Sequence, residues 1–321
     1  MNVTTPQGAL GGGGPQVSGH PQGSGGPLLI SSVEEFERLA ITAVTSINQA
    51  ERRQAEHLLL SQTQSQNPEV WNLCLCVLER GTNPAALPVA VIVLRNTVMS
   101  QWSRRQLSYE AHQANRIKAP TASGPSLTGS AEEEEQRRQL EECENRVVQL
   151  IRSMSRILQA HALLYETNPL QAAEFRVADR QMMYAVALLV KKGLASGLKS
   201  TKETLFQMLI SFLEELYSLA FSIARSGSAT AFSLAPPPTL LGLNLALCQL
   251  TEISKEIVST HLSFLQLTTQ QHVDCKKAYE TRVFLPLVDA SFSLLNFLVN
   301  APPAVSTPPS GLQRSPQHTL L

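Results

Sequence analysis

Aromatic and charged side chains are both scarce in this chain. Phe, Trp and Tyr make up 5% of its 321 residues and Asp, Glu, Lys and Arg make up 16%, whereas 43% are hydrophobic. The core of a β-sandwich draws on aromatic and β-branched residues. The low aromatic content therefore argues against a sandwich and favours packed helices rich in Leu and Ala.

The chain has no excess of either charge and no long apolar run. Lys plus Arg and Asp plus Glu both number 26, so no global field attracts nucleic acid or an anionic membrane. The most apolar run, Ala85–Leu94, is too short to cross a bilayer. The first residues are rich in Gly, Pro, Gln and Ser and lack the apolar segment of a secretory signal. We expect a soluble protein with no nucleic-acid partner and no membrane insertion.

Cysteine is also sparse, and its number is odd. The five cysteines are scattered through apolar or helical contexts: Cys74, Cys76, Cys143, Cys248 and Cys275. Such a pattern is typical of reduced thiols in a cytosolic or nuclear protein rather than of a disulfide framework.

Motifs for catalysis or metal binding are missing. The glycine run at 11–14 is not followed by Gly-Lys-Ser/Thr, and the seven histidines form no His-Glu-x-x-His pattern. On a helix, Cys74 and Cys76 point about 200° apart, so they cannot chelate one metal together. Glu132–Glu135 suit a helix start and Lys191-Lys192 a helix end, because these charges complement the helix dipole. We expect no catalytic residue, no metal and no cofactor, and hence a protein that is not an enzyme.

Apolar residues recur with helical spacing along most of the chain. One stripe comprises Val33, Phe36, Ala40, Ala43 and Ile47, and another comprises Val147, Leu150, Ile151, Met154, Ile157, Leu158 and His161. Gly81 stands where a helix would stop. No segment alternates with a sustained period of two. The sequence therefore predicts an all-α protein.

The predicted helices form pairs with short connections, and each pair occupies about 40 residues, the spacing of HEAT and armadillo units. A single pair cannot bury its apolar faces, so neighbours stack into an α-solenoid of antiparallel helix pairs. Val89–Leu94 is apolar on every side, as expected of a helix packed between adjacent repeats. The alternative is an ordinary globular helical bundle.

Composition divides the chain into one helical region and several loop-like segments. Gly, Pro, Ser and Thr dominate residues 1–28, 119–130, 226–238 and 300–321, which we predict to be disordered or loops. Pro236–Pro238 cannot lie inside a helix, so we expect it to separate two helices. The folded region is then 29–299, interrupted by flexible insertions near 119–130 and 226–238.

Several strings in this region resemble the importin-β superfamily of nuclear transport receptors. Residues 49–58 (QAERRQAEHL) are similar to the second helix of those receptors, and residues 93–102 (VLRNTVMSQW) to a later helix in which Leu-Arg/Lys-Asn precedes a closing Trp. Residues 67–81 (NPEVWNLCLCVLERG) and 180–193 (RQMMYAVALLVKKG) resemble the exportin-4 and exportin-7 group, and the second string favours the exportin-4 type. The similarity covers about 31–299. Family members continue for several times this length, so we expect a truncated or partial chain.

The resemblance implies a binding function. Receptors of this superfamily bind the GTPase Ran in its GTP form through the second helices of their first repeats, carry protein cargo, and shuttle between nucleus and cytoplasm past nuclear pore proteins. In this chain the corresponding helices would be about Glu51–Ser61, Pro88–Trp102 and Phe175–Lys192. The polar positions expected off their core stripes are Arg52, Arg53, Arg95, Asn96, Asp179 and Arg180. The alternative is a helical-repeat scaffold or adaptor whose binding does not depend on Ran.

Overall fold

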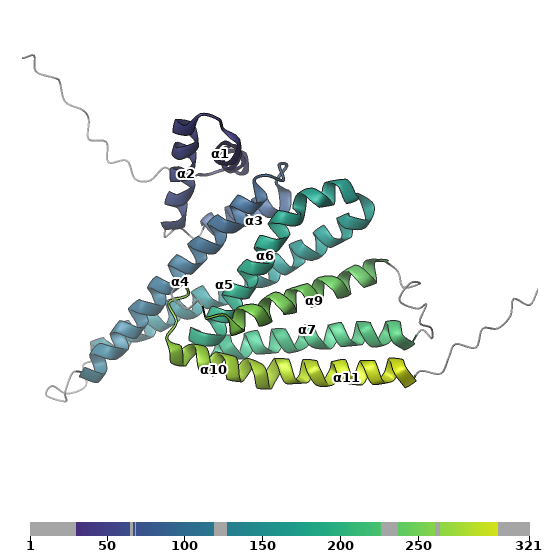
Figure 1. Ribbon diagram of the computed structural model, residues 1–321. Helices are drawn as coiled ribbons and strands as arrows, with labels where there is room; N and C mark the ends of the chain where they lie inside the picture. Colours follow the sequence, from purple (N-terminus) through teal and green to yellow (C-terminus); the bar gives the residue numbers. More distant parts are fainter. Residues whose placement is uncertain are drawn as a thin grey trace, which may run out of the picture.

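A computed structural model describes residues 30–64, 67, 69–118, 127–225, 237–260 and 264–300. Within these ranges the chain folds into helices and contains no β-strand (Figure 1). The elements are α1 (Val33–Thr45), α2 (Gln49–Gln64), α3 (Glu69–Arg80), α4 (Leu87–Lys118), α5 (Leu127–Thr167), α6 (Pro169–Ser196), α7 (Lys199–Arg225), α9 (Pro237–Val258), α10 (Thr269–Tyr279), the π-helical turn η1 (Glu280–Phe284) and α11 (Leu285–Asn300). The all-α prediction is confirmed.

The helices stack in two layers. The first helices of the successive pairs, α1, α3, α5 and α7, each contact the next, and α11 continues the series against α7. The second helices, α2, α4, α6 and α9, form a parallel series of contacts. We call these the A layer and the B layer; in Figure 1 the B layer lies toward the viewer. Two such layers of antiparallel pairs make the predicted solenoid.

Helix α4 lies at the centre of the first repeats. It packs against α2, α3, α5 and α6, which explains why its first turns are apolar on every side. Ala90, Val91, Val93 and Leu94 are buried, whereas Ile92 remains partly exposed. The predicted packing of this segment between repeats is confirmed.

Helix α1 is anchored to the next pair through a buried carboxylate. Glu37 accepts hydrogen bonds from the backbone N–H groups of Thr82, at 2.6 Å, and Asn83, at 3.1 Å. A Cβ atom on Gly81 would lie 2.8 Å from the Glu37 carboxylate and 2.3 Å from the Val77 carbonyl oxygen, so this approach requires glycine. Helix α3 ends at Arg80, as Gly81 predicted.

The structure corrects four predictions about where helices begin and end. Helix α1 ends at Thr45, and Ile47, which we assigned to its apolar stripe, is fully exposed. Helix α5 already begins at Leu127, so residues 127–130 of the predicted 119–130 insertion are helical. Helix α9 begins at Pro237, and α11 reaches Asn300. Proline is tolerated in a first turn because the N–H groups there lack helical partners.

The remaining residues of the predicted loops and tails lie outside the described ranges. These are residues 1–28, 119–126, 226–236 and 301–321, and their assignment stays a prediction. None of the described helices is both long and apolar enough to cross a membrane.

Lys191 and Lys192 do not end a helix, contrary to our prediction. Helix α6 continues through them to Ser196, and both side chains are fully buried. Gly193 follows within the helix because a Cβ atom there would lie 2.4 Å from Leu205 Cδ1 of α7. The Lys-Lys-Gly string therefore marks a close approach between helices and a buried pair of ammonium groups.

Candidate partner-binding face

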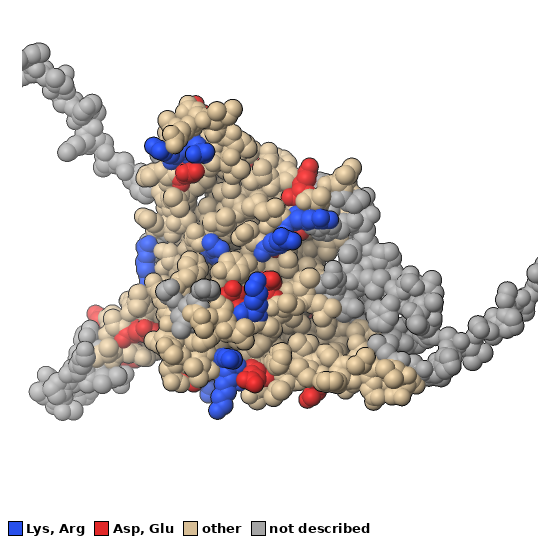
Figure 2. Space-filling view, viewed as in Figure 1, with Lys and Arg blue, Asp and Glu red and all other residues tan. Residues whose placement is uncertain are grey.

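The three helices predicted to bind a partner lie in the B layer. Glu51–Ser61, Pro88–Trp102 and Phe175–Lys192 fall within α2, α4 and α6, and each of these helices is the second of its pair. Figure 2 shows that charged side chains on this side form small separate groups among uncharged surface. A partner that docks here would meet isolated charges within a large uncharged area.

Arg52 and Arg53 are exposed on α2. Arg52 lies 3.8 Å from the carboxylate of Glu56, one turn further along the helix. An exposed pair of this kind contributes little to stability. Both guanidinium groups are therefore free to exchange their contacts for those of a partner.

Arg95 of α4 is held between two aromatic rings. Its guanidinium carbon lies 5.7 Å from the ring centroid of Tyr184 in α6 and 5.6 Å from that of Phe264. Each contact of this kind contributes roughly 0.5–1 kcal/mol at a partly exposed site. Burial lowers the pKa of Arg95, an effect that Tyr184 partly offsets, yet a guanidinium stays charged at neutral pH. We call Arg95, Tyr184 and Phe264 the arginine clamp.

Asn96 extends the arginine clamp into a shallow groove. Its side-chain oxygen accepts a hydrogen bond from Arg95 Nε at 3.1 Å. The groove has a volume of about 300 Å³ and lies between α4 and the turn at residues 264–266. Leu107 and Phe264 leave about half of their surface exposed at its edge. The groove therefore places two apolar contact points beside the arginine clamp.

Two buried lysines hold the turn that carries Phe264. Lys191 Nζ donates to the Ser259 carbonyl oxygen at 2.6 Å, and Lys192 Nζ donates to the Leu265 carbonyl oxygen at 3.1 Å. Gln266 adopts a φ of 54°, in the left-handed region that non-glycine residues rarely occupy. The lysines and the buried side chain of Leu265 thus hold this turn in a strained conformation against α6.

A polar network in the core accommodates Lys192. Its ammonium lies 5.5 Å from the ring centroid of Trp102. The indole N–H of Trp102 donates to Glu144 at 3.1 Å, and the Leu198 backbone N–H donates to the other carboxylate oxygen at 2.9 Å. Burial raises the pKa of Glu144 and lowers the pKa of Lys192 to about 8. The network connects α4, α5 and α6 beneath the arginine clamp.

Asp179 does not face solvent, so the position that we predicted for it is wrong. It is buried, and its Oδ1 lies 2.7 Å from Nδ1 of His161 in α5. The His161 ring stacks on Phe175 with centroids 4.5 Å apart. Asp179 therefore joins α5 to α6, whereas its neighbour Arg180 is exposed.

Residues 55–120 match the sequence model of a family described as the importin-beta N-terminal domain. Over these residues the chain is similar to an importin-β N-terminal domain. The match includes most of α2 and all of α3 and α4, and it supports membership of the importin-β superfamily. No curated protein and no solved structure matches the chain.

Arg95 and Asn96 lie within the matched residues, whereas Tyr184 and Phe264 of the arginine clamp lie beyond them. Sequence reasoning missed both aromatic residues. Their only signal was two large aromatic side chains beside polar residues, which many surface helices share. Arg180 lies one helical turn before Tyr184 on α6, whereas Arg52 and Arg53 lie on α2.

Proposed function

We propose that the chain is a nuclear transport receptor that binds Ran in its GTP form through the B-layer face of α2, α4 and α6. The observation that carries the proposal is the match of α2 to α4 to an importin-β N-terminal domain. This match includes Arg95 and Asn96, which form a charged and partly apolar surface with Tyr184 and Phe264. The protein is then a binding protein rather than an enzyme, and it shuttles between nucleus and cytoplasm.

We further propose that it acts in export and is of the exportin-4 type, with exportin-7 as the second choice. The support is the order of the strings at residues 67–81 and 180–193. Protein cargo and nuclear pore proteins are the remaining proposed partners. Cargo and Ran·GTP would bind with positive coupling, so that each raises the affinity for the other.

The test is a titration of the chain with Ran loaded with a non-hydrolysable GTP analogue, set against Ran·GDP. We expect tighter binding of the GTP form. Arg95→Glu combined with Asn96→Ala should weaken that binding about tenfold or more, because it replaces a desolvated positive charge at the contact by a negative one. Arg95 is half-buried between two rings, so circular dichroism must accompany each titration.

Two further variants make the result specific. Arg95→Lys keeps the positive charge but loses the planar contact with both rings. It should therefore weaken Ran binding, but by less than the charge reversal in Arg95→Glu does. Arg38→Glu reverses an exposed charge on α1 in the A layer and should leave binding unchanged. Equal affinity for the two nucleotide states would contradict a Ran-dependent receptor and favour a helical scaffold. A GTP preference that survives the double substitution would exclude Arg95 and Asn96 from the contact.

A further inference from the structure

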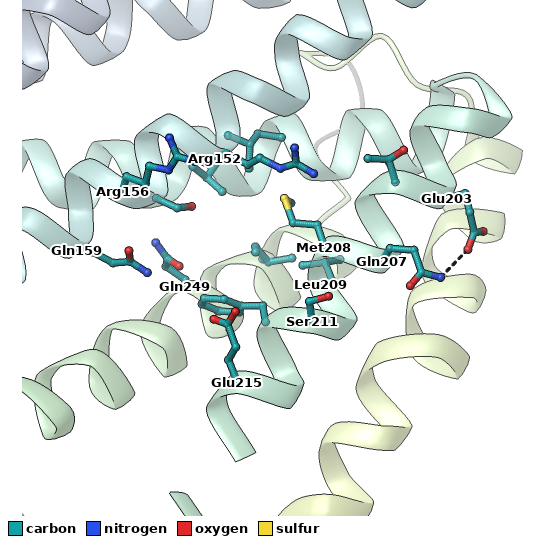
Figure 3. A pocket seen from close by; sticks show the side chains of 16 residues that line it. Arg152, Arg156, Gln159, Glu203, Gln207, Met208, Leu209, Ser211, Glu215 and Gln249 are labelled. Carbon is teal, nitrogen blue, oxygen red and sulfur yellow. Dashed lines mark hydrogen bonds between the residues drawn. The ribbon is translucent and has the colours of Figure 1, made fainter. Parts of the chain in front are cut away.

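The A layer contains a groove that the proposed Ran contact does not use. It lies between α5 and α7, has a volume of about 610 Å³, and is closed below by side chains of α6 and α9 (Figure 3). Ile151, Val186, Leu209 and Ile253 are buried in its floor, and Phe212 is half-buried. The floor therefore offers apolar surface to bulky apolar side chains.

One wall of the groove carries unpaired positive charge. Arg152 and Arg156 lie one helical turn apart on α5, and both are exposed. Neither forms an ion pair with any residue that the structure describes. Two guanidinium groups at this spacing can each donate two hydrogen bonds to a carboxylate.

The opposite wall does not neutralise these arginines. Glu203 of α7 already accepts hydrogen bonds from Arg282 at 2.8 and 3.0 Å and from Gln207 at 3.0 Å. These bonds lower the pKa of Glu203 to about 2. Glu215 is the one other acidic residue among those that line the groove. Among the residues that the structure describes, Arg152 and Arg156 thus have no ion-pair partner in the groove, and Glu215 is the acidic side chain that remains opposite them.

Gln249 supplies a buried donor at the bottom of the groove. Its side chain is 5% exposed, and its Nε2 has no hydrogen-bond partner within the described residues. Figure 3 shows this side chain pointing toward the wall that carries Arg156 and Gln159. A buried amide without a partner is unfavourable, because it has lost its hydrogen bonds to water. An acceptor that enters the groove would restore one.

We propose that this groove binds a peptide segment of a partner protein in which a carboxylate flanks bulky apolar side chains. The carboxylate lies against Arg152 and Arg156, the apolar side chains cover the floor, and a backbone carbonyl of the peptide accepts from Gln249. The groove lies in the A layer and uses none of the residues proposed to contact Ran. The proposal is therefore independent of the proposed Ran contact.

The test measures binding of short fluorescein-labelled peptides to the full chain by anisotropy. The first peptide alternates Glu with Leu and Phe, and the second carries Gln in place of each Glu. We expect the acidic peptide to bind about tenfold more tightly than the Gln peptide, with an affinity that falls as salt rises. Arg152→Glu together with Arg156→Glu should remove this difference. Arg137→Glu, an exposed reversal on the same helix outside the groove, should preserve it.

Gln249→Leu separates a ligand contact from a structural role. The substitution removes the unpartnered amide, so the free chain should melt at the same or a higher temperature. Peptide binding should nevertheless weaken several-fold, because the donor is gone. Equal binding of the two peptides, or an acidic preference that survives the double reversal, would overturn the proposal. So would unchanged peptide binding in Gln249→Leu with an unchanged melting temperature.

Discussion

Lys191 and Lys192 set the local chemistry of the B layer. Both are fully buried, and both donate to backbone carbonyls of the segment between α9 and α10. A buried ammonium is unfavourable unless it is paired and hydrogen-bonded. For Lys192 the carboxylates of Glu110 and Glu144 and the ring of Trp102 provide part of that compensation. The strained turn beside the arginine clamp therefore depends on two charges in the core.

Lys192→Met should change how stability depends on pH. Burial lowers the pKa of Lys192 from 10.5 to about 8, and unfolding restores it. Between these values the unfolded chain binds more protons at this site, so the site's contribution to stability rises with pH. Below pH 8 the lysine is charged in both states and the unfavourable burial is fully present. We expect the variant's free energy of unfolding, relative to wild type, to fall by about 3 kcal/mol at most from pH 8 to 10.5.

Urea unfolding at several pH values measures this difference. Burial raises the pKa of Cys143 and Cys275 to about 11, but both proteins contain these thiols, so the comparison isolates Lys192. Lys199→Met, which removes an exposed ammonium of α7, serves as the control for the loss of a lysine. A difference for Lys192→Met that does not change with pH would mean that the pKa of Lys192 is the same in the folded and the unfolded chain, which would contradict the prediction.

At the scale of the helices, two irregularities have identifiable causes. The turn η1 ends two residues before Pro286, and Leu285 donates its N–H to the Glu280 carbonyl, five residues back. A proline within a helix lacks the N–H and presses on the carbonyl four residues earlier. The wider π turn accommodates it without ending the helix. Gly193 is the second irregularity, because α6 and α7 approach each other over it.

Gly193→Ala tests that close approach. Alanine favours a helix over glycine by about 1 kcal/mol, so an unhindered site would gain stability. Here the new Cβ would lie 2.4 Å from Leu205 Cδ1 and 3.3 Å from Trp102 Cη2. We expect a net loss of about 1–3 kcal/mol in the free energy of unfolding, measured by thermal or urea denaturation.

Leu205→Ala provides the control for Gly193→Ala. Alone it should destabilise by about 2–5 kcal/mol, because it leaves a cavity. In that background Gly193→Ala should cost nothing or stabilise, since the obstructing methyl group is absent. Additive losses from the two substitutions would show that the helix approach does not depend on this contact.

At the scale of the whole molecule, the repeat could be predicted from the sequence, but the site only in part. The helical spacing of apolar residues involves only residues of one helix, so it can be recognised in the local sequence. The pairing of Asp179 with His161, and of Phe264 with Arg95, depends on which helices become neighbours. Lys191-Lys192 was misassigned because a charged pair before a glycine is also typical of a helix end. Local sequence does not distinguish a solvated lysine from a buried one.

The two-layer arrangement predicts that local stability differs along the solenoid. Helix α1 packs mainly against α2 and α3, whereas α6 packs against α4, α5, α7, α9 and α10. In a stacked repeat, each unit is stabilised by its neighbours, so a terminal pair can unfold while the rest stays folded. A large-to-alanine substitution in α1 should therefore destabilise fewer helices than one in α6.

Phe36→Ala in α1 and Leu189→Ala in α6 compare the two places, since both side chains are fully buried. Each should cost a few kcal/mol locally, about 3–5 for the phenylalanine and 2–5 for the leucine. Native-state amide exchange should show lost protection confined to α1 and α2 for Phe36→Ala. Leu189→Ala should lower protection in α4, α5, α7 and α9 as well as α6. Uniform loss along the chain in both variants would indicate one cooperative bundle, because a solenoid transmits destabilisation only through adjacent repeats.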